Sequence, residues 1–393
     1  MMLYPPEKIK IKKKPEAVRG DMAFSVKPVQ TKKDLKRFIK IPYTVYKNDP
    51  FWVPPLLYEE KRKYTADSNP MLEHCDYQHF MLYKNDNPVG RISGFINHFA
   101  NENWGEKRGL FGSYECIDNK EGAQLLFQAV YDWLKSQGAS LMQGPWGFSQ
   151  ECGLLIDNFN SSPMVMSPYN PSYYPDQFEF YGLHKVKDVF VYKIENGNSY
   201  NFPKKYGRVA HNIAKRYGVT VRSINLADMK NETKLLVKTA NESTKDNWGY
   251  MVVSDQEADS LAESLKMIVD PDIIMLAEIK GKPIGYMIVL PDVNVILKKL
   301  KGRLFPLGIF KLKFGIKKVR DYRIWGLGMI PGYRRKAIDV LFYNRLYDVL
   351  APKNPSCVEA NYVLEDNMSM NNPIKKLGFK KANTYRVYEK IIQ

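Results

Sequence analysis

The chain has 393 residues, with 59 Lys and Arg against 42 Asp and Glu and a formal net charge of +17. A hydrophobic fraction of 44% excludes disordered, collagen-like and low-complexity proteins. No apolar run reaches the roughly 18 residues of a membrane span, and none follows the basic amino terminus as a secretory signal requires. The four cysteines lack metal-ligand spacing, so we expect a reduced, cytoplasmic protein.

The first half of the chain predicts alternating strands and helices. Residues 25–29 favour a strand, and Thr31 marks the start of a helix. Apolar runs joined by polar turn residues predict a β-hairpin near 81–90. A strand near 110–117 and a helix over 121–138 follow, and the helical spacing of apolar residues indicates that this helix buries one face.

The second half repeats this order. Ser254 and Glu257 match a capping box, which predicts a helix from there to about residue 269. The other predicted elements are a strand at 219–224, a helix at 227–241, strands at 273–279, 283–290 and 322–330, a helix at about 337–350, a strand at 357–363, a short helix near 367–377 and a final strand pair.

Matched segments indicate an internal duplication. Met81-Leu82 precedes Pro88-Val89-Gly90 as Met275-Leu276 precedes Pro283-Ile284-Gly285. Gly182 precedes Tyr192, and Gly378 precedes Tyr388, by the same ten residues. Ordered matches at a nearly constant offset favour two copies with a boundary near 196–201. We therefore predict an α/β (α+β) protein with a flexible basic segment (1–23) and two lobes (24–196 and 197–393), each a mixed, mostly antiparallel sheet flanked by helices.

A basic, apolar segment lies between residues 293 and 320. It contains no acidic residue, and most of its other residues are aliphatic or Phe. Its nine cations are Lys298, Lys299, Lys301, Arg303, Lys311, Lys313, Lys317, Lys318 and Arg320. Cations alternating with apolar residues are typical of a membrane-surface segment, whereas nucleic-acid surfaces more often combine cations with exposed aromatics. A solvated basic flap over the core is the equally weighted alternative.

The segment from Gly326 to Ile338 carries the strongest chemical signal. A strand ends near Ile330, three consecutive cations (334–336) occupy the next turn, and a helix follows. Free backbone N–H groups and the positive end of a helix favour a diphosphate at such a turn, and the cations add charge-assisted hydrogen bonds. Surface cations also occur at ordinary strand-to-helix turns, so this pattern alone leaves phosphate binding open.

This segment resembles the acyl-coenzyme-A loop of the GNAT superfamily of N-acetyltransferases, a hydrophobic strand followed by Pro-x-Tyr-Arg and a short basic run. Asn367-x-x-Met370 followed by Leu377-Gly378-Phe379 resembles the ending of that superfamily. The resemblance covers most of 219–393 and, through the repeat, a diverged copy over 24–194. It implies acetyl-coenzyme A or a longer acyl-coenzyme A as co-substrate, and no metal. The residues that it assigns to the coenzyme are Met329, Ile330, Gly332, Tyr333, Arg334, Arg335, Lys336, Ala337 and Asn367.

Several residues depart from the superfamily pattern. The first copy has acidic residues at 115–121 in place of the basic loop, and these repel a diphosphate, so the resemblance assigns the coenzyme to the second copy. Asp339 stands where Gly is usual. Ile374 stands where the superfamily commonly has a Tyr that protonates the leaving thiolate, and the first copy has Phe178 there. Either another group supplies that proton or the chain performs no ordinary acetyl transfer.

Glu359 and Asn361 are the candidate catalytic residues. They lie two apart on one predicted strand, so their side chains share a face. If that face is turned to the acyl group, Glu359 accepts the proton of the attacking amine directly or through water. A strand-end carboxylate in a surface salt bridge is the more common situation and stays the alternative.

The resemblance implies an acyl-coenzyme-A-dependent N-acyltransferase that uses an amine acceptor. Tandem proteins of this look include enzymes that attach long acyl chains to lipid amines, as in bacterial ceramide synthesis, and the segment 293–320 suits a long chain or an anionic membrane surface. The alternatives are a non-catalytic acyl-coenzyme-A-binding or sensing protein and nucleic-acid binding, which rests on net charge alone and is not favoured. We expect a cytoplasmic protein, peripheral at the inner membrane surface.

Overall fold

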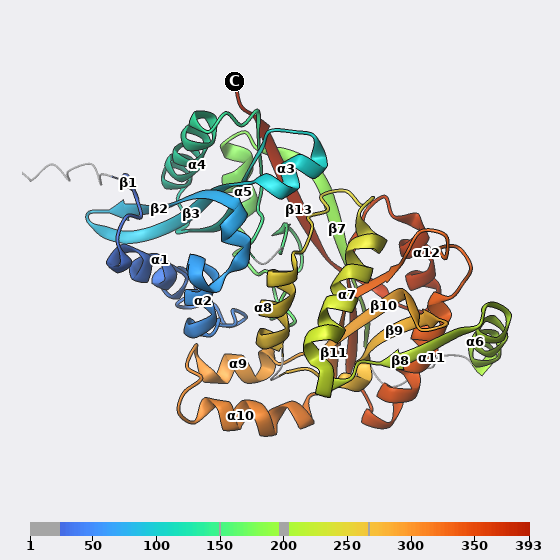
Figure 1. Cartoon of the computed structure of the whole chain (residues 1–393). Helices are drawn as coiled ribbons and strands as arrows, with labels where there is room; N and C mark the ends of the chain where they lie inside the picture. The colour runs from blue at the N-terminus through green and yellow to red at the C-terminus, as the bar shows by residue number, and fades with distance from the viewer. Residues whose placement is uncertain (1–23, 149–150, 196–203, 266–267) are drawn as a thin grey trace, which may run out of the picture.

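The computed structural model describes residues 24–148, 151–195, 204–265 and 268–393 (Figure 1). Their strands form one 13-stranded sheet in the order β1-β2-β3-β4-β5-β13-β7-β12-β11-β10-β9-β8, with β6 against β13. Two neighbouring pairs, β4·β5 and β11·β12, are parallel, and the other neighbours are antiparallel. The predicted mixed, mostly antiparallel sheet is confirmed. The segment 1–23 and the boundary near 196–201 lie outside the described residues.

The first half follows the predicted order. Thr31 caps α1 through a reciprocal hydrogen-bonded pair with Asp34, and Asn119 caps α4 by accepting the Gly122 N–H at 2.7 Å. Its principal elements are β1 (Phe24–Pro28), α1 (Lys32–Val45), α2 (Leu57–Lys63), β2 (Cys75–Lys84), β3 (Asn87–Asn97), α3 (His98–Trp104), β4 (Arg108–Cys116), α4 (Lys120–Ser136), β5 (Leu141–Gly144), β6 (Leu154–Leu155), α5 (Tyr174–Phe180) and β7 (His184–Glu195).

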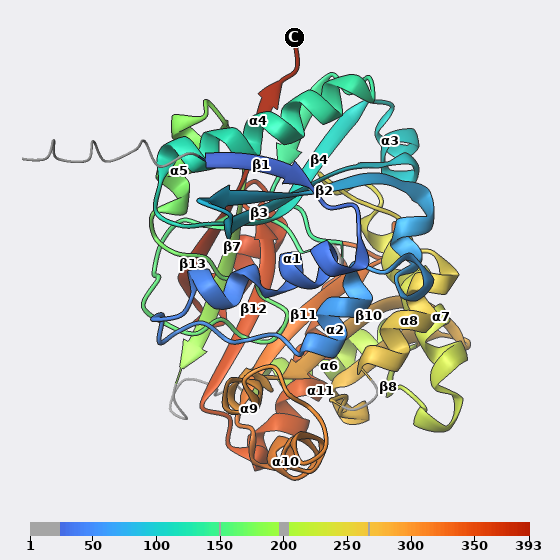
Figure 2. The same ribbon diagram turned by 90° about the vertical axis from the view of Figure 1, so that its left-hand side faces the viewer.

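The second half places helices on both faces of its strands. Helices α7 and α8 cover one face, and α11 and α12 cover the other (Figures 1 and 2). The predicted capping box at Ser254 and Glu257 is present. The principal elements are α6 (Lys204–Tyr217), β8 (Val219–Ser223), α7 (Met229–Thr244), α8 (Asp255–Leu265), β9 (Ile274–Ile279), β10 (Lys282–Pro291), α9 (Asn294–Leu300), α10 (Gly308–Gly315), β11 (Asp321–Met329), α11 (Asp339–Leu350), β12 (Cys357–Leu364), α12 (Met368–Lys376) and β13 (Lys380–Ile391).

The predicted final strand pair is wrong, because β13 is one continuous strand of 12 residues. It has no local partner to fold back on. Instead β13, the last strand of the second half, pairs with β5 of the first half, and β7, the last strand of the first half, pairs with β12 of the second. β7 and β13 also pair with each other at the centre of the sheet. Each half therefore completes its sheet with a strand of the other.

The repeated glycines end equivalent helices. Gly182 follows α5 with φ +84°, and Gly378 follows α12 with φ +91°, a conformation that favours glycine. The next residue closes the same six-residue ring in both copies, as Leu183 N–H donates to Phe178 O and Phe379 N–H donates to Ile374 O. This shared helix end supports the duplication read from the sequence.

The two parallel strand pairs differ beyond their first few residues. β11 pairs with β12 over four residues, from Asp321 opposite Cys357 to Ile324 opposite Ala360, and the strands then separate. In the first half the corresponding gap is closed, because Trp146 N–H donates to Phe111 O at 2.8 Å. A Cβ on Gly112 would lie 1.7 Å from the Trp146 carbonyl oxygen, so this close approach requires glycine. The second-half pair opens into a cavity.

The segment 293–320 forms α9 and α10, two helices that lie together at one end of the molecule (Figure 2). Leu300, Leu304 and Leu312 are buried and hold it against the sheet. The Asp292 carboxylate accepts N–H groups from Val165 and Asn294, which ties the start of α9 to a first-half loop. Among the described helices, none combines the length and apolarity of a bilayer-crossing segment.

The strand exchange predicts that the halves depend on each other. Cutting the chain after residue 195 leaves β5 without β13 in one fragment and β12 without β7 in the other, exposing a central strand edge in each. We expect each fragment expressed alone to aggregate or to lack a cooperative thermal transition, and the coexpressed fragments to copurify through a tag on one of them. A cooperative transition in either isolated fragment would contradict this expectation.

Candidate active site

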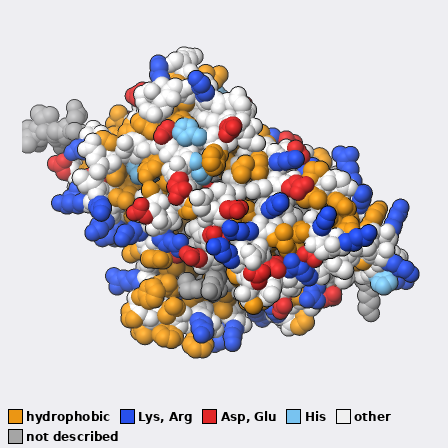
Figure 3. All heavy atoms as spheres, in the orientation of Figure 1, with side chains coloured by type: hydrophobic (Ala, Val, Ile, Leu, Met, Phe, Trp, Pro, Cys, Tyr) orange, Lys and Arg blue, Asp and Glu red, His pale blue; other side chains and the backbone are white. Residues whose placement is uncertain are grey.

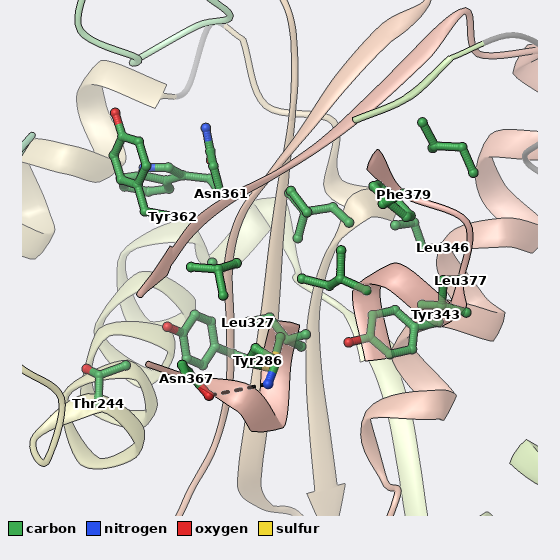
Figure 4. A pocket seen from close by; sticks show the side chains of 18 of the residues that line it. Thr244, Tyr286, Leu327, Tyr343, Leu346, Asn361, Tyr362, Asn367, Leu377 and Phe379 are labelled. Atoms are coloured by element: carbon green, nitrogen blue, oxygen red, sulfur yellow. Dashed lines mark hydrogen bonds between the residues drawn. The ribbon is translucent and has the colours of Figure 1, made fainter. Parts of the chain in front are cut away.

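A cavity of about 270 Å³ occupies the opening between β11 and β12 (Figure 4). Its walls come from both faces of the sheet, with Thr244 and Asn247 from α7 or just after it and a mainly apolar surface from α11 and α12. Its other lining residues include Tyr286, Ile324, Trp325, Leu327, Tyr343, Leu346, Ala360, Asn361, Tyr362, Val363, Asn367, Met370, Ile374 and Phe379. The cavity thus runs through the sheet where the strands separate.

Two glycines on β11 shape one wall. A Cβ on Gly328 would lie 2.4 Å from the Ser243 oxygen and 2.6 Å from the Tyr286 ring, and a Cβ on Gly326 would lie 2.9 Å from the same ring. Because both positions are glycine, the Tyr286 ring can lie flat against β11. Its cross-strand partner there is Gly328. Burial raises the pKa of Tyr286 to about 12, so its hydroxyl stays protonated at neutral pH.

Backbone N–H groups lie along the edge of β11 beyond Ile324, where β11 no longer pairs with β12. Ile330 N–H donates to Ile284 O at 2.9 Å and is therefore occupied. Because hydrogen-bonded pairs alternate along an antiparallel ladder, Leu327 and Met329 direct their N–H groups away from β10 and toward the opening. Of the predicted coenzyme residues Met329 and Ile330, Met329 has its N–H directed away from β10, and neither is among the described residues that line the cavity.

The predicted basic turn lies between β11 and α11. Helix α11 begins at Asp339, two residues later than predicted, because residues 331–338 form a run of turns. Gly332, Arg335 and Ala337 all have positive φ, at +88°, +60° and +55°. Two non-glycine residues in this conformation within one short turn mark it as a strained segment of the kind found at ligand sites.

The three cations of the turn have different surroundings. Arg334 donates to Met329 O and Ser243 O and pairs with Asp246 at 3.4 Å, so it fastens the turn to the end of α7. Arg335 and Lys336 are exposed. The Lys336 ammonium lies over the Tyr333 and Tyr217 rings, 5.1 and 5.7 Å from their centroids. Arg335 and Lys336 are the cations of this turn that are placed for an anion from solvent.

Asp339 and Asn367 begin the two helices that flank the cavity. Burial raises the pKa of Asp339, while backbone amides at the start of α11 and the Tyr343 hydroxyl lower it in part. Asn367 caps α12 by accepting the Met370 N–H at 3.3 Å and also lines the cavity. Among the described lining residues, Asn367 is the one that was predicted to contact the coenzyme.

Glu359 and Asn361 are joined on one face of β12, as predicted. Asn361 Nδ2 donates to Glu359 Oε1 at 2.6 Å, and Arg323 Nε donates to Asn361 Oδ1 at 2.7 Å. Lys193 of β7 pairs with Glu359 at 3.5 Å. Asn361 lines the cavity, whereas Glu359, 3% exposed, is not among the lining residues and lies behind Asn361.

These four side chains form a buried charge network. Burial raises the pKa of Glu359, and the charges of Lys193 and Arg323 oppose that shift. Arg323 is fully buried, and it also donates to Val165 O of the first-half loop. Removing the Glu359 charge leaves the Arg323 charge uncompensated in the interior, a change that strongly destabilises a fold.

Sequence reasoning missed several cavity residues. Tyr286, Thr244 and Tyr343 carry no motif, and Lys193 reaches Glu359 only through the exchange of β7. The alternating glycines Gly326 and Gly328 were the available signal, since small residues on a strand mark a close approach by another group. Among the described residues, no three His, Cys, Asp or Glu side chains gather as a metal site would require.

Comparison with known proteins identifies two relatives over nearly the full chain, although no family model matches. Protein YghO of Escherichia coli (strain K12) is 32% identical over 375 residues, 93% of this chain and 95% of that protein. The bacterial ceramide synthase of Caulobacter vibrioides (strain NA1000 / CB15N) is 32% identical over 378 residues, 94% of this chain and 97% of that protein.

Solved structures show the same fold at low identity. The tandem GNAT protein from the clavulanic acid biosynthesis pathway aligns with a TM-score of 0.55 at 10% identity, over 94% of this chain and 99% of that one. A GCN5-related N-acetyltransferase from Sphaerobacter thermophilus gives 0.52 at 12% identity, over 94% and 96%. The chain therefore belongs to the family of the bacterial ceramide synthase and protein YghO, and it has the fold of the tandem GNAT proteins.

Proposed function

We propose that this protein transfers an acyl group from a coenzyme A thioester to a lipid amine at a membrane surface. The observation that carries the proposal is the cavity through the split sheet, which shares β11 and α11 with the basic turn. The GNAT fold and the relationship to a ceramide synthase support acyl transfer in general. A ceramide is the fatty amide of a long-chain amine, which supports a lipid acceptor.

The donor is expected to enter from the face covered by α11 and α12. Arg335, Lys336 and the amides of the turn suit its diphosphate, and the apolar wall from α12 suits its pantetheine arm and acyl chain. The free N–H groups of Leu327 and Met329 then lie on the strand edge that a thioester carbonyl meets, where they stabilise the oxyanion of the tetrahedral intermediate.

The acceptor amine is expected on the opposite face, beside α7. Thr244, Asn247 and Asn361 give this end of the cavity its polar groups. Hydrogen bonds with Arg323 and Glu359 fix the Asn361 side chain at the cavity wall. We propose that Asn361 orients the amine and that Glu359 accepts its proton through water.

The outer surface of α9 and α10 supports contact with an anionic bilayer. Phe305, Leu307, Phe310 and Phe314 are 67%, 68%, 58% and 64% exposed, although large apolar side chains are rarely so open. Apolar side chains gather over α9 and α10, with Lys and Arg side chains beside them (Figure 3). Exposed rings among cations are what an interfacial helix requires to insert beside anionic headgroups.

Coenzyme binding is tested by thermal shift with coenzyme A, acetyl-coenzyme A and palmitoyl-coenzyme A. A ligand at 100 times its Kd stabilises the folded state by about 2.7 kcal/mol, so we expect Tm to rise by a few degrees. R335A/K336A should lose most of this rise, because it removes the two exposed cations of the turn. K317A/K318A, with the same charge change in the 293–320 segment, is the matched control. No rise with any thioester would contradict the proposal.

The role of Glu359 is tested by E359Q, which keeps a group of the same shape beside Asn361 but cannot accept a proton. We expect transfer to a long-chain amine to fall by about 10²–10⁴-fold, with a lower Tm because Arg323 and Lys193 lose their counter-charge. E365Q, the same substitution near the end of β12 and away from the cavity, should retain activity. Wild-type turnover in E359Q would remove Glu359 from the mechanism.

Membrane contact is tested by flotation with vesicles of phosphatidylcholine and phosphatidylglycerol. Each Phe buried in the bilayer contributes roughly 1.5–3 kcal/mol, so F310S/F314S should weaken partitioning by about 10²-fold or more. F99S/F180S removes two other exposed Phe side chains, from outside this segment, and should have no effect. Absence of wild-type binding to anionic vesicles at low salt would contradict the membrane part of the proposal.

A non-catalytic acyl-coenzyme-A-binding protein is the second candidate. It is favoured by one observation, that the described lining residues include no carboxylate and no imidazole. The two candidates separate in one assay of wild-type protein with palmitoyl-coenzyme A and a long-chain amine. Amide formation selects the transferase, and a thermal shift without amide selects the binding protein.

A further inference from the structure

The proposed transfer releases a thiolate, and this inference rests on that proposed function. As the amine attacks, a C–N bond forms and the C–S bond breaks with its electron pair passing to sulfur. The ammonium proton leaves on the acceptor side of the sheet, and the sulfur must gain a proton on the donor side to become coenzyme A. A general acid at that position lowers the barrier to departure.

Three described tyrosines are the ionisable residues that line the cavity, and they differ in where their hydroxyls point. The Tyr286 hydroxyl is engaged by Ser243. The Tyr362 hydroxyl is directed away from the centre of the cavity, whereas the Tyr343 hydroxyl is directed toward it from α11 (Figure 4). Tyr343 is therefore the proton donor placed on the donor side.

The Tyr343 hydroxyl has an unusual environment. Its oxygen is buried, and it interacts with the Asp339 carboxylate without forming a hydrogen bond of good geometry. A buried hydroxyl without a well-aligned acceptor lowers the stability of the fold. A bound ligand atom that accepts its hydrogen removes this cost. Burial raises the pKa of Tyr343, and the Asp339 carboxylate one helical turn earlier raises it further, so the phenol carries its proton at neutral pH.

We propose that Tyr343 protonates the departing thiolate and that Asp339 returns a proton to the tyrosinate. The phenol O–H breaks as the S–H bond forms, the protonated form of Asp339 gives its proton to the phenolate oxygen, and water at the exposed turn then protonates Asp339 again. The amine proton that leaves on the acceptor side balances the proton taken up from solvent. The net reaction yields one amide and one free coenzyme A thiol.

The inference explains two departures from the superfamily pattern, Ile374 and Asp339, by a single proton pathway. Ile374 leaves the α12 side of the cavity without a proton donor, and Tyr343 supplies one from α11 in the same cavity. Asp339, at the exposed end of that helix, connects the phenol to solvent. Burial raises the pKa of Asp339, which increases the fraction of the carboxyl that carries a proton to give.

The first test is single-turnover transfer by Y343F. We expect its rate constant to fall by about 10²-fold or more, with the Kd for palmitoyl-coenzyme A within about twofold of wild type. Y347F, the same substitution one turn later on α11 and outside the cavity lining, is the matched control and should transfer normally. D339N should slow repeated turnover more than the first turnover, because it impairs only the return of the proton. An unchanged rate constant in Y343F overturns the inference.

The second test does not depend on transfer activity. The thiol of bound coenzyme A is titrated by the ultraviolet absorbance of its thiolate in wild type, Y343F and Y347F. Loss of a hydrogen bond to a charged sulfur should raise the proton affinity of the bound thiol about tenfold or more in Y343F alone. Equal titrations in all three proteins overturn the inference. If wild type forms no amide, the proposed function fails, and this titration still decides whether Tyr343 contacts the sulfur.

Discussion

The separation of β11 from β12 is the constraint on which the rest of the molecule depends. Parallel neighbours that part leave backbone groups unpaired, a cost that a sheet bears only if each strand keeps its other neighbour. β11 keeps β10, and β12 keeps β7 from Cys357 opposite Glu195 to Leu364 opposite Val189. The unpaired edges that remain face the cavity, where a thioester carbonyl and a pantetheine amide would satisfy them.

The strand that holds β12 in place belongs to the first half of the chain, which gives that half a structural role at the site. Its own parallel pair is bridged by the hydrogen bond from Trp146 N–H to Phe111 O. It supplies β7, the Lys193 charge beside Glu359, and the loop carbonyl of Val165 that Arg323 contacts. The site of the second half is therefore completed by side chains and backbone from both copies.

Local signals in the sequence predicted local structure, but they did not predict which strands pair across the whole chain. The caps at Thr31 and Ser254, the hairpins and the glycines Gly182 and Gly378 are confirmed because each depends on residues within one turn or one hairpin. The exchange of β7 and β13 was missed because strand order is set by pairing across the whole chain. The inward-facing phenol of Tyr343 was missed for the same reason, since helical periodicity identifies a buried face but not the opening that it borders.

The two faces of the sheet divide the proposed chemistry. The wall formed by Ile324, Ala360 and Ile374 belongs to the apolar cluster shared with α11 and α12, beside the basic turn. Tyr286, on the other wall, belongs to the cluster that includes Leu300 and Leu312 of the 293–320 segment. A water-soluble thioester would thus enter beside exposed cations, and a lipid amine would arrive on the face that packs against α9 and α10. Because the cavity crosses the sheet, each substrate reaches the reacting carbon from the surface that suits its own solubility.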